Sequence, residues 1–140
     1  MNAKEYLQQA QKIDRIVKSK LNQIERLESL ATSASQTLDP TGSHASADPT
    51  KGSKLENMVV GIIDLKEQVQ KQASKLIEVR KEITETINSI NNLSVQFILE
   101  ERYLLYRTWD EIADETGFSK NYLYHMHSTG LQLVDGVLRK

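Results

Sequence analysis

The chain has 140 residues, of which 39% are hydrophobic and 26% are charged, with a formal net charge of −1, which is typical of a folded protein of one or two small domains. It contains no cysteine, which excludes disulfides, zinc fingers and thiol chemistry. No apolar run approaches the roughly 20 residues that span a bilayer, and the first residues form no signal peptide, so we expect a cytoplasmic protein without a membrane segment.

The first predicted element is a long helix over residues 3–38, a stretch without glycine or proline. Its apolar residues recur every seven positions, and a second apolar series with one lysine interruption runs beside them. A seven-residue repeat of this length predicts a helix that packs along a partner helix. The residues of the first series are Ala10, Val17, Ile24, Ala31 and Leu38.

Residues 39–53 hold both prolines of the chain and no large apolar residue, so we predict a flexible linker there. A second long helix is expected to begin at Ser53, because Ser53 and Glu56 have the spacing of a capping box. This helix has an unbroken seven-residue repeat, formed by Leu55, Ile62, Val69, Leu76, Ile83 and Ile90.

Two helices of this length can lie antiparallel as a coiled-coil-like hairpin, closed by the linker. One hairpin would bury only a narrow stripe, and further apolar residues widen the surface of both helices. We therefore predict that residues 1–93 form an oligomerisation region, with a homodimer favoured and the seven-residue repeat of the second helix as its contact. The additional apolar residues are Ile16, Leu21, Leu30, Val59, Ile63, Ile77 and Ile87.

A third helix is predicted from Val95 to about Tyr106, after the interruption at residues 91–92 and with Ser94 as its cap. It is strongly apolar and would support the helices that follow. Residues 94–140 are thus expected to form a separate three-helix domain, which completes an all-α fold. Its expected core residues are Ile98, Leu105, Trp109, Ile112, Ala113, Phe118, Leu123 and Leu131.

Residues 108–134 have the pattern of a helix-turn-helix. Thr108 and Glu111 are spaced as a capping box, which predicts a helix start. Gly117 can adopt the left-handed conformation that ends this helix, and Ser119 can cap the next one. Two helices joined by a three-residue turn are the usual frame that places one helix in a DNA major groove.

The start of the second helix in this frame carries side chains that suit DNA contacts. Asn121 can pair with adenine and Lys120 with guanine or phosphate, while Tyr122 and Tyr124 offer hydroxyls and flat rings. Residues just before the first helix suit a phosphate. Alternatively, all of these are ordinary surface residues of a helical bundle. The predicted DNA-binding residues are Arg107, Thr108, Ser119, Lys120, Asn121, Tyr122, Tyr124 and His125.

The charge of the same segment favours a different partner. Residues 94–140 hold five basic and seven acidic residues, whereas most non-specific DNA affinity comes from phosphate neutralisation. The sequence therefore leaves two interpretations open. In the first, the protein reads duplex DNA; in the second, the long helices or the acidic face bind RNA polymerase or another protein.

Other classes of function are not expected. His125 and His127 are two residues apart, which places them about 200° apart around a helix, so they do not share a metal ion. The sequence has no glycine-rich phosphate loop and no nucleophile motif, so we predict that the protein is not an enzyme and has no cofactor.

The C-terminal third resembles the fourth region of bacterial sigma factors, which reads an upstream promoter element. The resemblance lies in the aromatic-Asp-Glu-Ile-Ala run at 109–113, in Gly117-Phe118-Ser119, and in Leu123 and Leu131. That family usually has alanine at the position of Gly130. Its DNA contacts would fall on Thr108, Lys120, Asn121, Tyr124 and His125.

The layout of the whole chain is similar to small phage and prophage proteins of Gram-positive bacteria. These join an N-terminal helical region, with openings like Ala3-Lys4-Glu5-Tyr6-Leu7, to a sigma-like helix-turn-helix that includes Arg102-Tyr103 and the 109–113 run. Related phage proteins regulate late-gene transcription, and the resemblance implies that role, in the cytoplasm of a bacterial host.

Overall fold

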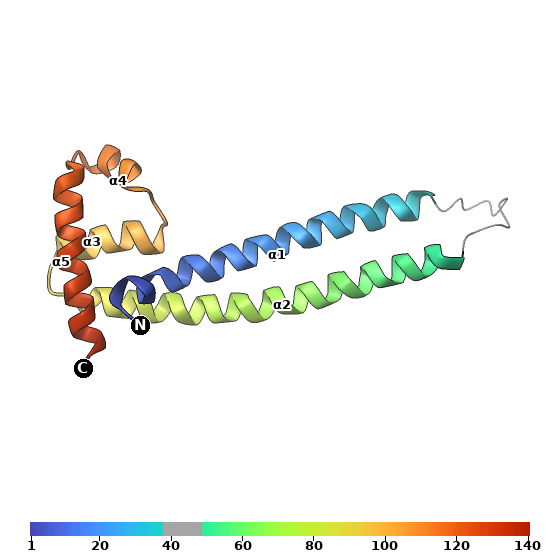
Figure 1. The fold of residues 1–140 in the computed structure, drawn as a ribbon, viewed down its shortest axis with the longest axis horizontal. Helices are drawn as coiled ribbons and strands as arrows, with labels where there is room; N and C mark the ends of the chain where they lie inside the picture. The colour runs from blue at the N-terminus through green and yellow to red at the C-terminus, as the bar shows by residue number, and fades with distance from the viewer. Residues whose placement is uncertain (38–48) are drawn as a thin grey trace. The chain divides into compact units, whose positions relative to one another are not determined.

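The computed structural model describes residues 1–37 and 49–140, and within these ranges the chain is helical with no strand, so the predicted all-α class is confirmed (Figure 1). Two long helices lead into a set of shorter ones. The elements are α1 (Ala3–Thr37), α2 (Pro49–Asn88), α3 (Leu93–Leu99), the π-helical segment η1 (Glu100–Leu104), α4 (Trp109–Thr116) and α5 (Lys120–Leu138).

Packing divides the chain into two compact units. One consists of residues 15–73 and is called the hairpin unit here; the other combines residues 1–14 with 74–140 and is called the head unit. These units differ from the predicted ranges 1–93 and 94–140, because the start of α1 and the end of α2 belong to the head unit. Whether residues 94–140 fold alone stays a prediction.

In the hairpin unit, α1 and α2 lie antiparallel (Figure 1). The Lys66 ammonium lies 3.3 Å from the Glu28 carboxylate, and Lys20 donates a hydrogen bond of 2.6 Å to Gln68. Ile24 from the seven-residue repeat of α1 is buried. The predicted pairing of the two long helices is therefore present within one chain.

The start of α2 differs from the prediction. The helix begins at Pro49, so Ser53 and Glu56 lie inside it and do not cap it. The physical reason is that proline suits the first turn, where its fixed φ is already helical and its missing amide hydrogen is not needed. The rest of the predicted linker, residues 39–48, lies outside the described residues.

The head unit has a core built from both ends of the chain. Tyr6, Leu7 and Ala10 of α1 pack with Ile83 and other apolar residues of α2, α3 and α5. The Tyr6 hydroxyl is 2.9 Å from that of Thr86, and the Ala3 amide donates a 2.8 Å hydrogen bond to Asp135. The remaining buried members are Ala3, Ile87, Ile90, Val95, Leu99, Tyr103 and Val134.

The third helix begins and ends differently from the prediction. Asn92, and not Ser94, caps it, because the Asn92 side chain accepts a 3.2 Å hydrogen bond from the Val95 amide. The helix then widens into η1, where the Leu105 amide reaches back five residues to the Glu100 carbonyl. The chain leaves the helix at Tyr106, whose φ of 59° is left-handed.

None of the described helices has the length and apolar character needed to cross a membrane.

Candidate nucleic-acid interface

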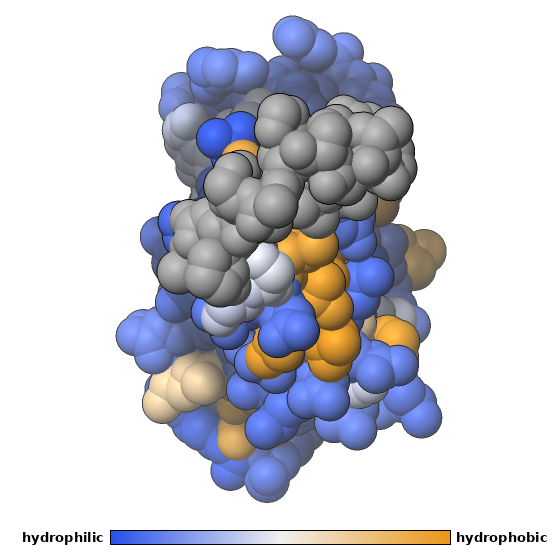
Figure 2. All heavy atoms as spheres, turned by 90° about the vertical axis from the view of Figure 1, so that its right-hand side faces the viewer, coloured by the Kyte–Doolittle hydropathy of each residue, from blue (hydrophilic) through white to orange (hydrophobic). Residues whose placement is uncertain are grey.

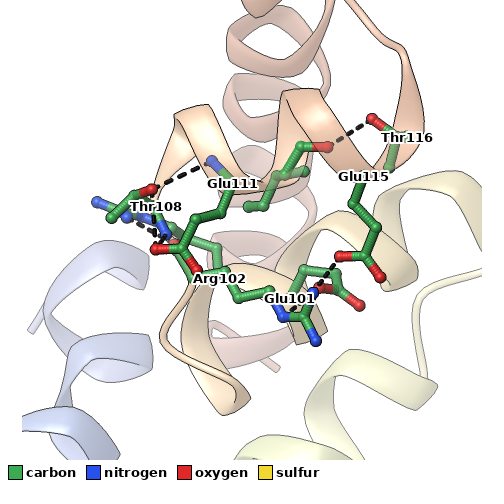
Figure 3. Close-up of polar contacts among 8 residues, drawn as sticks. Glu101, Arg102, Thr108, Glu111, Glu115 and Thr116 are labelled. Atoms are coloured by element: carbon green, nitrogen blue, oxygen red, sulfur yellow. Dashed lines mark hydrogen bonds and ion pairs between the residues drawn. The ribbon is translucent and has the colours of Figure 1, made fainter.

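The first helix of the predicted helix-turn-helix, α4, begins as the sequence indicates. The Glu111 amide donates a 3.2 Å hydrogen bond to the Thr108 hydroxyl, and the Glu111 carboxylate accepts from the Thr108 amide at 3.5 Å (Figure 3). The capping box is therefore confirmed. The capping box also occupies the hydroxyl and the amide of Thr108, a residue predicted to contact a DNA phosphate.

The turn into α5 is also confirmed. Gly117 adopts φ 75°, the left-handed conformation, and its amide bonds to the Ala113 carbonyl at 2.9 Å. The Ser119 hydroxyl then accepts a 3.1 Å hydrogen bond from the Tyr122 amide and caps α5. Ser119 thus has a structural role, because its cap determines where α5 starts.

Two helices, α3 and α4, pack against one side of α5. Leu123 is buried against Ile98 of α3 and Ile112 of α4. Further along α5, Gly130 lies so close to α3 that a Cβ built there would be 3.0 Å from Val95 and 3.3 Å from Leu99. This glycine lets the two helix backbones approach closely.

Two predicted core residues are exposed. Leu105 is 53% exposed because η1 adds one residue to a helical turn, which moves the following positions about 100° around the axis. Phe118 is 43% exposed because it lies in the turn and packs on the ring of Tyr122, with centroids 4.8 Å apart. The prediction that both residues belong to the core is wrong.

A partly buried aromatic cluster packs α5 against η1 and α4. His127 and the Tyr103 hydroxyl share a 2.6 Å hydrogen bond, and the His127 ring meets the edge of Trp109 at 4.8 Å between centroids. The Arg102 guanidinium lies 4.9 Å over the Trp109 ring. Burial lowers the pKa of His127 to about 4 and raises that of Tyr103 to about 12.

This bracing role of His127 is not among the predictions from the sequence, which concern only metal binding at this residue. A signal was present, because His127 follows Leu123 by four residues and precedes Leu131 by four. At helical spacing those neighbours place it on the apolar side of α5. No group of three or more potential metal ligands occurs among the described residues.

The opposite side of α5 is an exposed polar strip, called the reading face here. It consists of Asn121, Tyr124, His125 and Ser128, which lie three, four and seven residues along one side of the helix from Asn121 onward and are all exposed. Tyr124 also packs edge-on against Trp109, with centroids 5.5 Å apart. Three of the predicted DNA-binding residues are therefore together on one surface that the protein core leaves uncovered.

The two predicted basic contacts are held by carboxylates. The Arg107 guanidinium lies 3.0 Å from the Glu101 carboxylate and also pairs with that of Glu115. The backbone carbonyl of Arg107 accepts a 2.9 Å hydrogen bond from the Arg102 guanidinium (Figure 3). Glu101 is buried, and burial raises its pKa although the Arg107 guanidinium acts in the opposite direction.

Lys120 forms an exposed ion pair with Asp110 of α4, and this hydrogen-bonded partner raises the pKa of Lys120. Asp110, Glu111, Asp114 and Glu115 give α4 an exposed acidic surface beside the start of α5. Positive charge is thus partly neutralised where the sequence analysis expected phosphate contacts.

Three of the six residues predicted to mediate oligomerisation pack within the chain, and whether the other three contact a second copy stays a prediction. Ile83 and Ile90 are buried in the core of the head unit, and Leu76 packs against that core. Leu55, Ile62 and Val69 are half-buried in the hairpin unit. Ile87, expected to widen the exposed apolar surface, is fully buried as well.

The exposed apolar residues of the hairpin unit lie outside this repeat. Figure 2, which looks at the right-hand side of Figure 1, shows a patch of apolar side chains between polar ones. Val59, Val60 and Ile63 form a compact group on α2, one and four residues apart. The exposed apolar residues of α1 in this unit are Ile16, Leu21 and Leu30.

Residues 41–135 match a family described as "Protein of unknown function (DUF1492)". The chain belongs to this family. The DUF1492 region covers α2, the helix-turn-helix and most of α5. Neither the curated proteins nor the solved structures yield a match to the chain.

Proposed function

We propose that this protein binds duplex DNA sequence-specifically and regulates transcription, with α5 as the helix that enters the major groove. The observation that carries the proposal is the reading face, in which Asn121, Tyr124 and His125 are exposed on a helix whose start is fixed by Ser119. Helix-turn-helix proteins read bases with side chains near the start of this second helix.

The chemistry of the reading face suits bases better than phosphates. An asparagine amide can donate to and accept from adenine in the major groove, and a tyrosine ring can contact a thymine methyl group. The local resemblance to the fourth region of sigma factors and the layout shared with phage regulators support the same role. In this proposal the protein acts in the cytoplasm of a bacterial host.

The head unit has no excess of positive charge to attract DNA phosphates, so a dimer is part of the proposal. The seven-residue repeat of α2 is used inside the chain, so a second copy would dock on the exposed group Val59, Val60 and Ile63. Two reading faces on one duplex would bind more tightly than either alone, because the second binds at a high effective concentration.

Light scattering on the full chain tests the dimer. The variant Val60→Glu with Ile63→Glu should be monomeric, whereas the control Ile77→Glu, which changes an exposed isoleucine of the head unit, should keep the mass of the unchanged protein. A monomeric unchanged protein, or a double variant that still dimerises, would refute this contact.

Selection from random duplex DNA tests sequence reading. The unchanged chain should enrich a defined sequence, and Lys120→Ala with Asn121→Ala should lose that preference while keeping its helicity. The matched control is Lys54→Ala with Asn57→Ala, which removes the same two exposed residue types from α2. The absence of any enriched sequence at low salt would refute base reading.

The acidic surface of α4 favours a second candidate function, binding to RNA polymerase or another phage or host protein. Arg107 and Lys120 are already paired with carboxylates, while Asp114 and Glu111 are exposed. Such a partner would carry a basic surface. Affinity capture from a nuclease-treated host lysate, with Asp110→Asn and Asp114→Asn as the variant, should lose the partner if this function applies.

A further inference from the structure

Trp109 is the first residue of α4, and its ring contacts both η1 and α5. The Arg102 guanidinium of η1 lies 4.9 Å over this ring. The rings of His127 and Tyr124 on α5 meet it steeply, at 71° and 86°, with centroids 4.8 and 5.5 Å away. The capping box at Thr108 determines where α4 begins and so fixes the backbone of Trp109. The indole is therefore held by three neighbours, one of which belongs to the reading face.

The members of this group differ in exposure. Trp109, Arg102 and His127 are half-buried, whereas Tyr124 is 46% exposed. A tyrosine on a helix has two common χ1 rotamers, and exposed side chains exchange between them within nanoseconds. Edge-to-face aromatic pairs at this separation are stabilised beyond the area that they bury. The contact with Trp109 therefore favours one orientation of the Tyr124 ring before DNA binds.

We propose that Trp109 is a positioning residue for base reading, which holds the Tyr124 ring in the orientation that contacts a thymine methyl group in the major groove. Trp109 acts through Tyr124 and makes no contact with DNA itself. A side chain that is already ordered loses less conformational freedom when it binds, so its contact adds more to discrimination between bases. The inference rests on the proposed function, because it names the residue that tunes one side chain of the reading face.

A purely structural role of Trp109 makes different predictions. Trp109 packs against a buried cluster that includes Ile112 and Leu123, so its replacement also weakens the head unit. A structural role would lower stability and would reduce the affinity for every duplex by the same factor. A positioning role changes the preference for one base pair over the other three.

Competition binding followed by fluorescence anisotropy tests the proposal on the full chain. The labelled probe is a duplex with the sequence enriched by selection from random DNA, and the competitors carry single base-pair changes. Tyr124→Ala should lose discrimination at one base pair, and Trp109→Leu should lose roughly two- to tenfold of the discrimination at the same base pair. Trp109→Phe keeps an aromatic ring beside Tyr124 and should retain most of it.

A double variant shows whether Trp109 acts through Tyr124. When Tyr124 is already alanine, Trp109→Leu should have no further effect on discrimination at that base pair. The matched control is Ile112→Val, which shortens a fully buried side chain of α4. It should lower stability but leave discrimination at every base pair unchanged. Equal effects of Trp109→Leu and Ile112→Val on discrimination would overturn the inference.

Tryptophan emission provides a second measurement that needs neither DNA nor a change at Trp109. Trp109 is the only tryptophan of the chain, so the emission reports the surroundings of this ring alone. Tyr124→Ala should shift the emission to longer wavelength, because water replaces the tyrosine ring beside the indole. His125→Ala removes an exposed neighbour on the same face and should leave the emission unchanged. An unchanged emission in Tyr124→Ala would overturn the inference.

These outcomes separate the inference from the proposed function. If the unchanged chain enriches a sequence and Trp109→Leu weakens all duplexes by the same factor, the positioning role fails and sequence reading survives. If the unchanged chain enriches no sequence, the proposed function fails, and the positioning role fails with it.

Discussion

Replacement of Gly130 by alanine tests how closely α5 approaches α3. The added methyl group would lie 3.0 Å from the Val95 side chain and 3.3 Å from Leu99, both fully buried. Because both buried neighbours would have to shift by a few tenths of an ångström, we expect an overpacking cost of about 1–3 kcal/mol. Alanine also favours a helix interior over glycine by roughly 0.5–1 kcal/mol, which offsets part of that cost.

Gly136→Ala provides the matched control on the same helix, because a Cβ there meets no atom within 4 Å. This variant should be up to about 1 kcal/mol more stable than the unchanged protein. Gly130→Ala should therefore be less stable than Gly136→Ala by about 1–3 kcal/mol, the overpacking cost alone.

Urea unfolding followed by circular dichroism would measure this difference as a shift in midpoint at equal slope. In thermal unfolding, the gap should correspond to roughly 3 °C for each kcal/mol in a chain of this size. If Gly130→Ala were as stable as Gly136→Ala, the close approach of α5 to α3 would be wrong.

Two further predictions concern ionisable groups. Between about pH 6.5 and 4 the unfolded chain protonates His127 while the folded chain resists it, so stability should fall as the pH falls through this window. Urea midpoints at pH 7 and pH 5 should show a smaller loss for His127→Gln than for the unchanged protein, and an unchanged loss for the control His125→Gln. Arg107→Ala leaves the buried Glu101 without its ion-pair partner and should lower the unfolding free energy by about 2 kcal/mol or more, while Lys120→Ala breaks an exposed pair and should change the unfolding free energy much less. Equal unfolding free energies for the two alanine variants would contradict the structural role of the buried pair.

The helix-turn-helix was predictable because its signals are local. A capping box, a left-handed glycine and a serine cap are each defined by a few adjacent residues, and Thr108, Gly117 and Ser119 all take the expected conformations. The all-α class followed from the seven-residue repeats for the same reason. Such patterns need no knowledge of distant contacts.

The errors arose where a distant contact or a subtle backbone change decides the structure. Leu105 is exposed because η1 shifts the helical register, and no residue pattern in the sequence announced that π-helical turn. The helix α2 begins at Pro49, although a proline at this position is equally compatible with a linker. Ala10 belongs to the seven-residue repeat of α1, yet it packs in the core of the head unit.

The candidate site was predicted in part. Asn121, Tyr124 and His125 are exposed together on α5, whereas Thr108 and Arg107 are engaged in contacts within the protein. Spacing along a helix determines which residues share a side, so the first group could be read from the sequence. Ion pairing depends on how segments meet in space, which spacing does not reveal.

The head unit joins the first fourteen residues to the last helix, and this has a consequence for synthesis on the ribosome. Leu7 and Ala10 leave the exit tunnel early, but Val134, which completes their core, is made more than 120 residues later. Contacts this distant in sequence form slowly, so the antiparallel pairing of residues 15–73 can precede them. The core of the head unit is therefore completed only after Val134 has been made, and a product that stops before this residue would have an incomplete core.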